Sequence, residues 1–183
     1  ALALSFTLTP GYRLACALCF LLGMLYAIPP VRLAGRGGWD LATVALGFGF
    51  LTPYAGVAAT GKSLDLVSGL VLLGFVPLAA GCRALAATPG GLRSLWFAIW
   101  GCAAAFGLWL VAWLLRGEPW YVPAGALLGL ISLAIAFAAW MSVLLPWRRQ
   151  HEAMSTAQHR RGLVQAAIAW VVTDGAIVAA FGL

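Results

Sequence analysis

Long apolar stretches separated by short polar segments dominate the pattern along the chain. An apolar stretch of about 17 to 25 residues, bounded by charge, proline or glycine, is long enough to cross a bilayer as a helix. Such stretches lie at about 12–28, 41–59, 65–86, 92–115, 121–145 and 162–182. The pattern predicts an all-α fold, a polytopic membrane helical bundle of about six transmembrane helices, within one transmembrane domain over residues 1–183.

Glycine and proline interrupt the second of these predicted spans. The residues that break the second span are Gly47, Gly49, Pro53 and Gly56. Membrane helices tolerate such residues where neighbouring helices satisfy the freed backbone groups, so we expect this helix to kink and to face protein or a cavity more than lipid. Gly125 and Gly129 form a GxxxG motif on the fifth span, which suits close helix contact although it is common by chance in glycine-rich spans.

Basic residues are distributed unevenly between the two sets of alternate loops. The segments 29–40, 83–93 and 146–161 contain Arg32, Arg36, Arg83, Arg93, Arg148, Arg149, Arg160 and Arg161. The other set contains Arg13, Lys62 and Arg116. Because Arg and Lys concentrate in cytoplasmic loops, this asymmetry supports six spans and places the first set on the cytoplasmic side of an inner membrane.

Composition agrees with a membrane protein. The chain is 63% hydrophobic and 9% charged, whereas a soluble domain has about a quarter of its residues charged. The formal net charge of +6 is explained by loop orientation, and no basic run is interleaved with aromatic residues, so nucleic acid is not an expected partner. Membrane lipids are the expected partners.

Candidate metal and redox residues are sparse. Cys16 and Cys19 form a C-x-x-C motif inside a predicted span, and with Cys82 and Cys102 they fit buried thiols better than a zinc or redox site. His151 and His159 are eight positions apart with one carboxylate between them, which does not suit a metal site. The surrounding segment 147–161 fits a short amphipathic helix on anionic lipid or a solvated loop equally well.

The N-terminal residues 1–9 are similar to the last turns of a helix already under way. They include no initiator Met, no basic region and no small-residue cleavage pattern of a signal peptide. We therefore expect the chain to begin inside a longer protein.

The most informative stretch reads YAIPPVRLAGRGG at 26–38, ALGFGFLTPYAG at 45–56 and ATG at 59–61. It resembles the Y-S-x-P-P-x-R-x-K-x-R-G…G-x-G…P-x-x-G pattern of the UbiA superfamily of intramembrane prenyltransferases. The resemblance covers about 35 residues closely and the remainder by helix order. In that family the stretch links the fourth and fifth of nine helices, which makes the six spans helices four to nine.

The resemblance implies ionisation of an allylic diphosphate and transfer of its isoprenoid chain to a hydrophobic acceptor. Mg²⁺ neutralises the leaving diphosphate and is held by carboxylates from two Asp-rich motifs. The first motif precedes the segment present here, so Mg²⁺ is expected only if such a motif lies upstream. The second reads D-x-x-x-D-R-x-x-G-K-R-T-L in the family, and aligning it with residues 83–95 puts Arg83 and Ala87 at the aspartate positions.

Neither Arg83 nor Ala87 can bind a cation, and Arg83 would repel one. The other carboxylates do not replace the aspartates, because Asp40 and Glu152 lie in other loops and Asp65 and Glu118 lie on the opposite side. No catalytic residue, metal ligand or cofactor is therefore predicted for this chain.

Five residues remain as site candidates. Arg32, Arg36 and Arg93 match the family pattern and suit bidentate phosphate contact, with a diphosphate or with lipid headgroups, and orientation charges explain them equally well. Tyr26 matches a position near the cavity mouth. Asp174 lies about mid-span in the last helix, where an acid is a functional candidate, although a packing role explains it at least as well.

Two functions follow from these observations. The first is a UbiA-like prenyltransferase homologue, degenerate or partial and non-catalytic as a chain. The second is an accessory or scaffold subunit of a larger membrane complex that binds lipid, quinone or pigment. A transporter or channel subunit fits less well, because Asp174 is nearly the only ionisable residue deep in a span.

Overall fold

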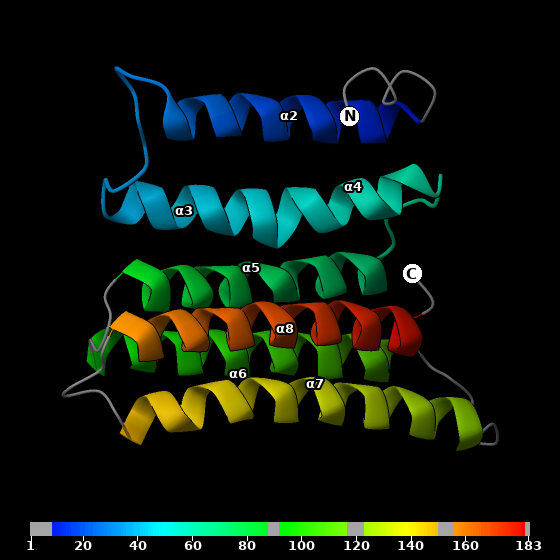
Figure 1. Ribbon diagram of the computed structural model, residues 1–183. Helices are drawn as coiled ribbons and strands as arrows, with labels where there is room; N and C mark the ends of the chain where they lie inside the picture. The colour runs from blue at the N-terminus through cyan, green and yellow to red at the C-terminus, as the bar shows by residue number, and fades with distance from the viewer. Residues whose placement is uncertain (1–8, 88–91, 117–122, 150–155, 182–183) are drawn as a thin grey trace.

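In the computed structural model, successive membrane-length helices run in opposite directions and form a stack (Figure 1). The structure describes residues 9–87, 92–116, 123–149 and 156–181. Regular structure in these ranges is helical throughout. The elements are α2 (Pro10–Ala27), α3 (Gly38–Leu46), the π-helical turn η1 (Gly47–Leu51), α4 (Thr52–Ala59), α5 (Leu66–Ala87), α6 (Leu92–Leu115), α7 (Pro123–Arg149) and α8 (Thr156–Phe181). Within the described ranges, six helical segments are long and apolar enough to cross a membrane, with α3, η1 and α4 forming one of them. The prediction of an all-α polytopic bundle is confirmed.

Helix α5 ends at Ala87, within one residue of the predicted span, so Arg83 lies in a helix and not in a loop. Two other helices extend well beyond the apolar stretches that predicted them. Helix α7 continues through Pro146 to Arg149, and α8 already begins at Thr156. Most of the segment 147–161 therefore belongs to these two helices and is not a separate amphipathic helix, while residues 150–155 lie outside the described part. Helices extend in this way because long basic side chains can reach the interface while their backbone stays hydrogen-bonded.

Local signals set where two of the helices begin. Thr9 precedes α2, and its hydroxyl oxygen accepts a hydrogen bond from the backbone N–H of Tyr12 at 3.3 Å, while Pro10 occupies the first helical position. Asp65 precedes α5 and accepts a hydrogen bond from the N–H of Ser68 at 2.8 Å. Hydrogen bonds from the Ser68 side chain and backbone hold the pKa of Asp65 below its usual value.

The stack follows a simple order. In Figure 1 helix α2 is outermost, the α3–η1–α4 span comes next, and α5 lies between that span and the group formed by α6, α7 and α8. The last turns of α2, α5 and α7 lie at the same end as the first turns of α3, α6 and α8. We call this end the arginine-rich end, since the loops predicted to share one side of the membrane connect these turns. The side of the membrane itself is a separate question.

The interrupted second span packs against α5 at backbone distance. The glycine-rich run forms the π-helical turn η1, in which a Cβ on Gly49 would lie 2.7 Å from the Cα of Val76 and 2.8 Å from the carbonyl oxygen of Phe75. No larger residue fits there without moving α5. The expected break is thus a π turn, a rare irregularity that occurs mostly as a single turn within an α-helix. The opposite face remains open, because Phe48 is 65% exposed, so this span does not avoid lipid altogether.

Helices α5 and α6 are also in close contact. A Cβ on Gly101 would collide with the carbonyl oxygen of Pro77, and one on Gly74 would collide with the indole of Trp109. That indole is fully buried and donates a hydrogen bond to the carbonyl oxygen of Val71 at 2.9 Å. Small residues that let backbones approach are the usual basis of helix association in membranes.

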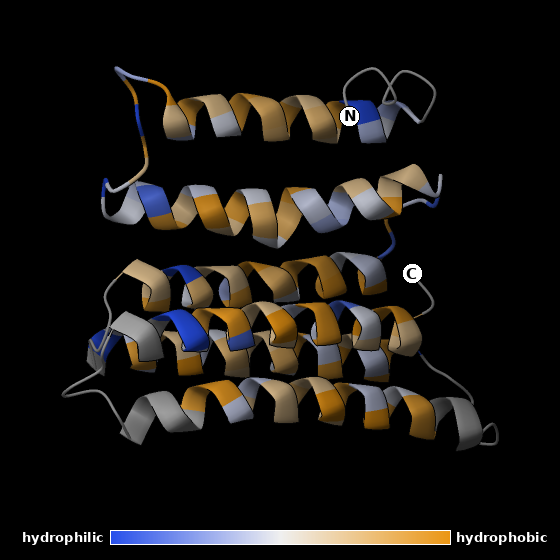
Figure 2. Cartoon of the chain, viewed as in Figure 1, coloured by the Kyte–Doolittle hydropathy of each residue, from blue (hydrophilic) through white to orange (hydrophobic). Residues whose placement is uncertain are grey.

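The buried core lies among α5, α6, α7 and α8. Hydrophobic residues predominate along the helices, as the colouring of Figure 2 shows. The side chain of Trp113 on α6 packs against Gly129, so this glycine of the GxxxG motif receives an indole. Helix α2 contributes little to the core, since Ala15 is its one buried residue. Its remaining apolar side chains are available to lipid or to another helix.

We expect Gly49→Ala to lower the free energy of unfolding by about 1–3 kcal/mol, because the added methyl group would overlap the α5 backbone. Gly107→Ala is the matched control, since a Cβ at this exposed position on α6 meets nothing within 4 Å. Thermal unfolding of both variants in detergent measures the difference. Equal melting temperatures would contradict the close packing of η1 on α5.

Candidate functional site

Two places in the bundle bring polar side chains into the interior, and the first is at the arginine-rich end. The side chain of Asp40, in the first turn of α3, is 8% exposed. It accepts hydrogen bonds from the Tyr26 hydroxyl at 3.0 Å and the Gly35 N–H at 3.2 Å. It also accepts two from Arg83 on α5, one from Nε at 3.0 Å and one from Nη2. A buried carboxylate is thereby both neutralised and fully hydrogen-bonded.

This cluster corrects two expectations from the sequence. Asp40 was placed in a loop apart from Arg83, but the two side chains form an ion pair across 43 positions of sequence. Arg83 is therefore not a free charge that would repel a cation, because Asp40 balances it. The one indication of this ion pair in the sequence is that Asp40 is an acid within an arginine-rich segment. The sequence does not identify its partner, because Asp40 and Arg83 meet only through the packing of α3 on α5.

The other candidates at this end are more exposed. Arg32 and Arg36 lie in the loop between α2 and α3, and the Arg36 guanidinium donates a hydrogen bond to the carbonyl oxygen of Pro30 at 2.9 Å. Arg93 is exposed in the first turn of α6, which packs against α5 and α7 and not against α3. Ala87 is exposed at the last position of α5. The structure therefore places the three arginines at one end but on different layers of the stack.

The described residues contain no group of three or more His, Cys, Asp or Glu side chains that could hold a metal ion. The four cysteines are free thiols, and Cys102 is buried in the α5–α6 contact region. His151 and Glu152 lie outside the described residues, as does the side chain of His159. The chemistry of this end is consequently that of one internal ion pair and several exposed arginines.

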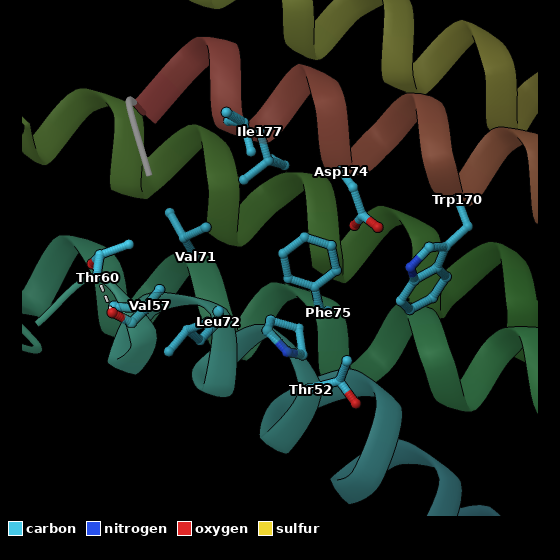
Figure 3. A pocket seen from close by; sticks show the side chains of 12 residues that line it. Thr52, Val57, Thr60, Val71, Leu72, Phe75, Trp170, Asp174 and Ile177 are labelled. Carbon is cyan, nitrogen blue, oxygen red and sulfur yellow. Dashed lines mark hydrogen bonds between the residues drawn. The ribbon is translucent and has the colours of Figure 1, made fainter. Parts of the chain in front are cut away.

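The second place is a groove between α4, α5 and α8, which we call the α4–α5–α8 groove (Figure 3). Its volume is about 360 Å³. The lining residues are Thr52, Pro53, Gly56, Val57, Thr60, Val71, Leu72, Phe75, Trp170, Asp174, Ile177 and Val178. Most of this wall is apolar. It forms because α8 packs on α7 along its length and touches α5 at few points.

Aromatic side chains and one acid define the middle of the groove. The rings of Phe75 and Trp170 have centroids 5.9 Å apart and bridge α5 to α8. Asp174 lies one turn after Trp170, and both side chains point into the groove (Figure 3). The neighbouring Thr173 faces the other way, where it is fully buried and accepts a hydrogen bond from the Trp140 indole at 2.9 Å.

Of the two residues proposed to line a cavity, Asp174 lies in the wall of this groove, whereas Tyr26 is bonded to Asp40 at the arginine-rich end. The sequence did not indicate that α4 supplies one side of the groove. Thr52, Gly56 and Thr60 share a face of α4 with helical spacing, but their partners on α8 are more than 100 positions away in the chain. Only the packed structure joins them.

Comparison with known proteins found no matching family model, no matching curated protein and no matching solved structure. The resemblance of residues 26–61 to the UbiA superfamily therefore stays an expectation. The Asp40–Arg83 pair and the α4–α5–α8 groove are the structural features that bear on function.

We expect Arg83→Ala to destabilise the protein by about 3 kcal/mol, because it leaves the buried Asp40 carboxylate without its counter-charge. Arg93→Ala removes an exposed arginine at the same end and should cost less than about 0.5 kcal/mol. Unfolding in detergent compares the two variants.

The double variant Asp40→Leu/Arg83→Leu gives a further comparison. It removes both charges together, so it should be more stable than Arg83→Ala alone. An Arg83→Ala variant as stable as Arg93→Ala would show that the ion pair does not support the fold.

Proposed function

We propose that this chain is a UbiA-like multi-pass membrane protein that binds an apolar lipid chain of isoprenoid, quinone or pigment type in the α4–α5–α8 groove without transferring it. The observation that carries the proposal is the groove itself. Its volume of about 360 Å³ lies within the roughly 300–1,000 Å³ of small-molecule sites. Its wall combines aliphatic side chains with the rings of Phe75 and Trp170, which suits an apolar ligand.

The side chains at the arginine-rich end support binding without transfer. Ionising an allylic diphosphate requires Mg²⁺ held by carboxylates. At the positions where the family resemblance would put aspartates, the chain has Arg83 and Ala87. Among the described residues, the carboxylate that contacts Arg83 is that of Asp40, which already accepts hydrogen bonds at both of its oxygens from Arg83, Tyr26 and the Gly35 backbone.

A second candidate is an accessory subunit of a larger membrane complex. Helix α2 favours this alternative, since Ala15 is its one fully buried residue and it packs mainly on η1 and α4. Leu14, Phe20 and Leu21 are each more than half exposed along it. Such a face contacts lipid in a monomer, and it also provides a surface for a neighbouring transmembrane helix.

The orientation that we propose puts the arginine-rich end in the cytoplasm. Arg32, Arg36 and Arg93 are exposed there, as are Arg160 and Arg161 in the first turns of α8. Arginines at this level pair with the phosphates of anionic lipids. They would hold the bundle in register with the bilayer and attract a phosphate-bearing headgroup.

Cysteine labelling tests this orientation. In a background where the four native cysteines are replaced by alanine, we expect Ser63→Cys, between α4 and α5, to react with a membrane-impermeant maleimide in intact cells. Arg36→Cys should react only after the membrane is opened. The reverse pattern would contradict the proposed orientation.

Occupation of the groove can be tested with a residue that fills it. A Cβ at Gly56 meets nothing within 4 Å, so Gly56→Phe places a ring in the groove without moving α4. In nanodiscs containing the full-length protein, this variant should lower the binding of a tritiated C15 isoprenoid at least tenfold. Gly107→Phe, on an open face of α6 outside the groove, should bind as the wild type does.

Three outcomes would contradict the proposal. If wild-type protein binds no isoprenoid, or if both phenylalanine variants bind equally well, the groove is not the site. If the full-length protein consumes geranyl or farnesyl diphosphate in a Mg²⁺-dependent reaction, the chain belongs to an active transferase and the non-catalytic part of the proposal fails.

A further inference from the structure

The polar atoms of the α4–α5–α8 groove are predominantly acceptors. Two threonine hydroxyls line it, and each donates its hydrogen to its own helix. Thr52 donates to the carbonyl oxygen of Gly47 at 2.9 Å, and Thr60 donates to that of Val57 at 2.7 Å, as the dashed line in Figure 3 shows for Thr60. The Thr60 oxygen also accepts a hydrogen bond from the Lys62 N–H at 3.4 Å. Since a hydroxyl oxygen has two lone pairs, both threonines can still accept a hydrogen bond from a ligand.

Asp174 is the strongest of these acceptors. Its carboxyl group points into an otherwise apolar section of the groove beside Phe75 (Figure 3). Within the described part of the chain, no ion pair involves it, because the one pair joins Asp40 to Arg83. The indole of Trp170, the one nitrogen donor among the lining side chains, lies a single turn away on the same face and hydrogen-bonds to the Asp174 carboxyl group. The indole has a single N–H, so it does not occupy all the acceptor sites of the two carboxyl oxygens.

An acid at this depth in a membrane helix is unfavourable unless a hydrogen-bond donor or a cation reaches it. A diphosphate is the wrong partner, because its negative charge would face the Asp174 carboxyl and the threonine oxygens. The exposed arginines that suit a phosphate are also distant. Asp174 lies 14 residues after Arg160 in the same helix, which is about 21 Å along the axis at 1.5 Å per residue.

We infer that the groove selects an apolar molecule that carries an uncharged hydroxyl group, such as a prenyl alcohol, and that this hydroxyl donates a hydrogen bond to Asp174. The inference rests on the proposed function and adds the chemical class of the ligand. The chain of the ligand lies along Val71, Leu72 and Ile177, whose side chains form the apolar wall. The hydroxyl gives the acid a second donor beside the Trp170 indole and places the ligand in the half of the bundle away from the arginine-rich end.

The test compares three probes of equal chain length in nanodiscs with the full-length protein. They are farnesol, the hydrocarbon in which hydrogen replaces its hydroxyl group, and farnesyl diphosphate. Wild-type protein should prefer farnesol over the hydrocarbon roughly five- to tenfold, which is the size of one buried hydrogen bond. It should bind the diphosphate no better than the hydrocarbon.

Two variants at position 174 separate hydrogen bonding from folding. Asp174→Leu removes the acceptor at similar volume, so it should lose the preference for farnesol while still binding the hydrocarbon, which shows that the groove is intact. Asp174→Asn keeps a carbonyl acceptor and should retain most of the preference. Gly56→Phe should reduce the binding of both probes and serves as the blocked control.

The outcomes distinguish this inference from the proposed function. If wild-type protein binds farnesol and the hydrocarbon equally, and Asp174→Leu changes neither, the hydroxyl selection is wrong although the groove still binds isoprenoids. A preference for the diphosphate that persists in Asp174→Leu would also overturn it. If neither neutral probe binds to wild-type protein, the proposed function fails together with the inference.

Discussion

Close packing on two sides of α5 is the constraint on which the rest of the structure depends. In a bilayer, lipid chains are as apolar as leucine side chains, so helices associate through van der Waals contact at short distance. Gly49 allows η1 to contact one side of α5 at backbone distance, and Gly101 allows α6 to contact the other side in the same way. The third side faces α8, where the rings of Phe75 and Trp170 meet and keep the two backbones apart. The groove is the space left beside that contact.

The Asp40–Arg83 pair gives the same stack a polar anchor. Burying one charge without the other would be costly in a low-dielectric interior, and the hydrogen bonds from Tyr26 and Gly35 complete the satisfaction of the carboxylate. The cluster joins the end of α2, the start of α3 and the last turns of α5. Tyr26, Gly35 and Arg83 are all hydrogen-bonded to Asp40. This bonding stabilises an arginine at the position where the family resemblance implies a metal-binding acid.

The two polar regions divide the bundle between them. Exposed arginines at one end suit phosphates at the membrane surface, while Asp174 lies within an apolar groove about 21 Å from the level of Arg160. A polar group of a ligand that binds to the exposed arginines therefore cannot also contact Asp174. This separation favours a protein that holds a neutral lipid inside the membrane and uses its charges for position in the bilayer.

The helical class, the six spans and the grouping of arginines at one end can all be read from the amino-acid sequence, because the length of apolar runs and the spacing of charges follow directly from bilayer thickness. The same reading marks Gly49 as a break and Asp174 as an unusual acid. The pairing of Asp40 with Arg83 and the groove enclosed by α4 and α8 become visible only when the helices are packed. Those contacts join residues 43 and more than 100 positions apart, and side-chain fit between helices, which no local pattern encodes, selects them.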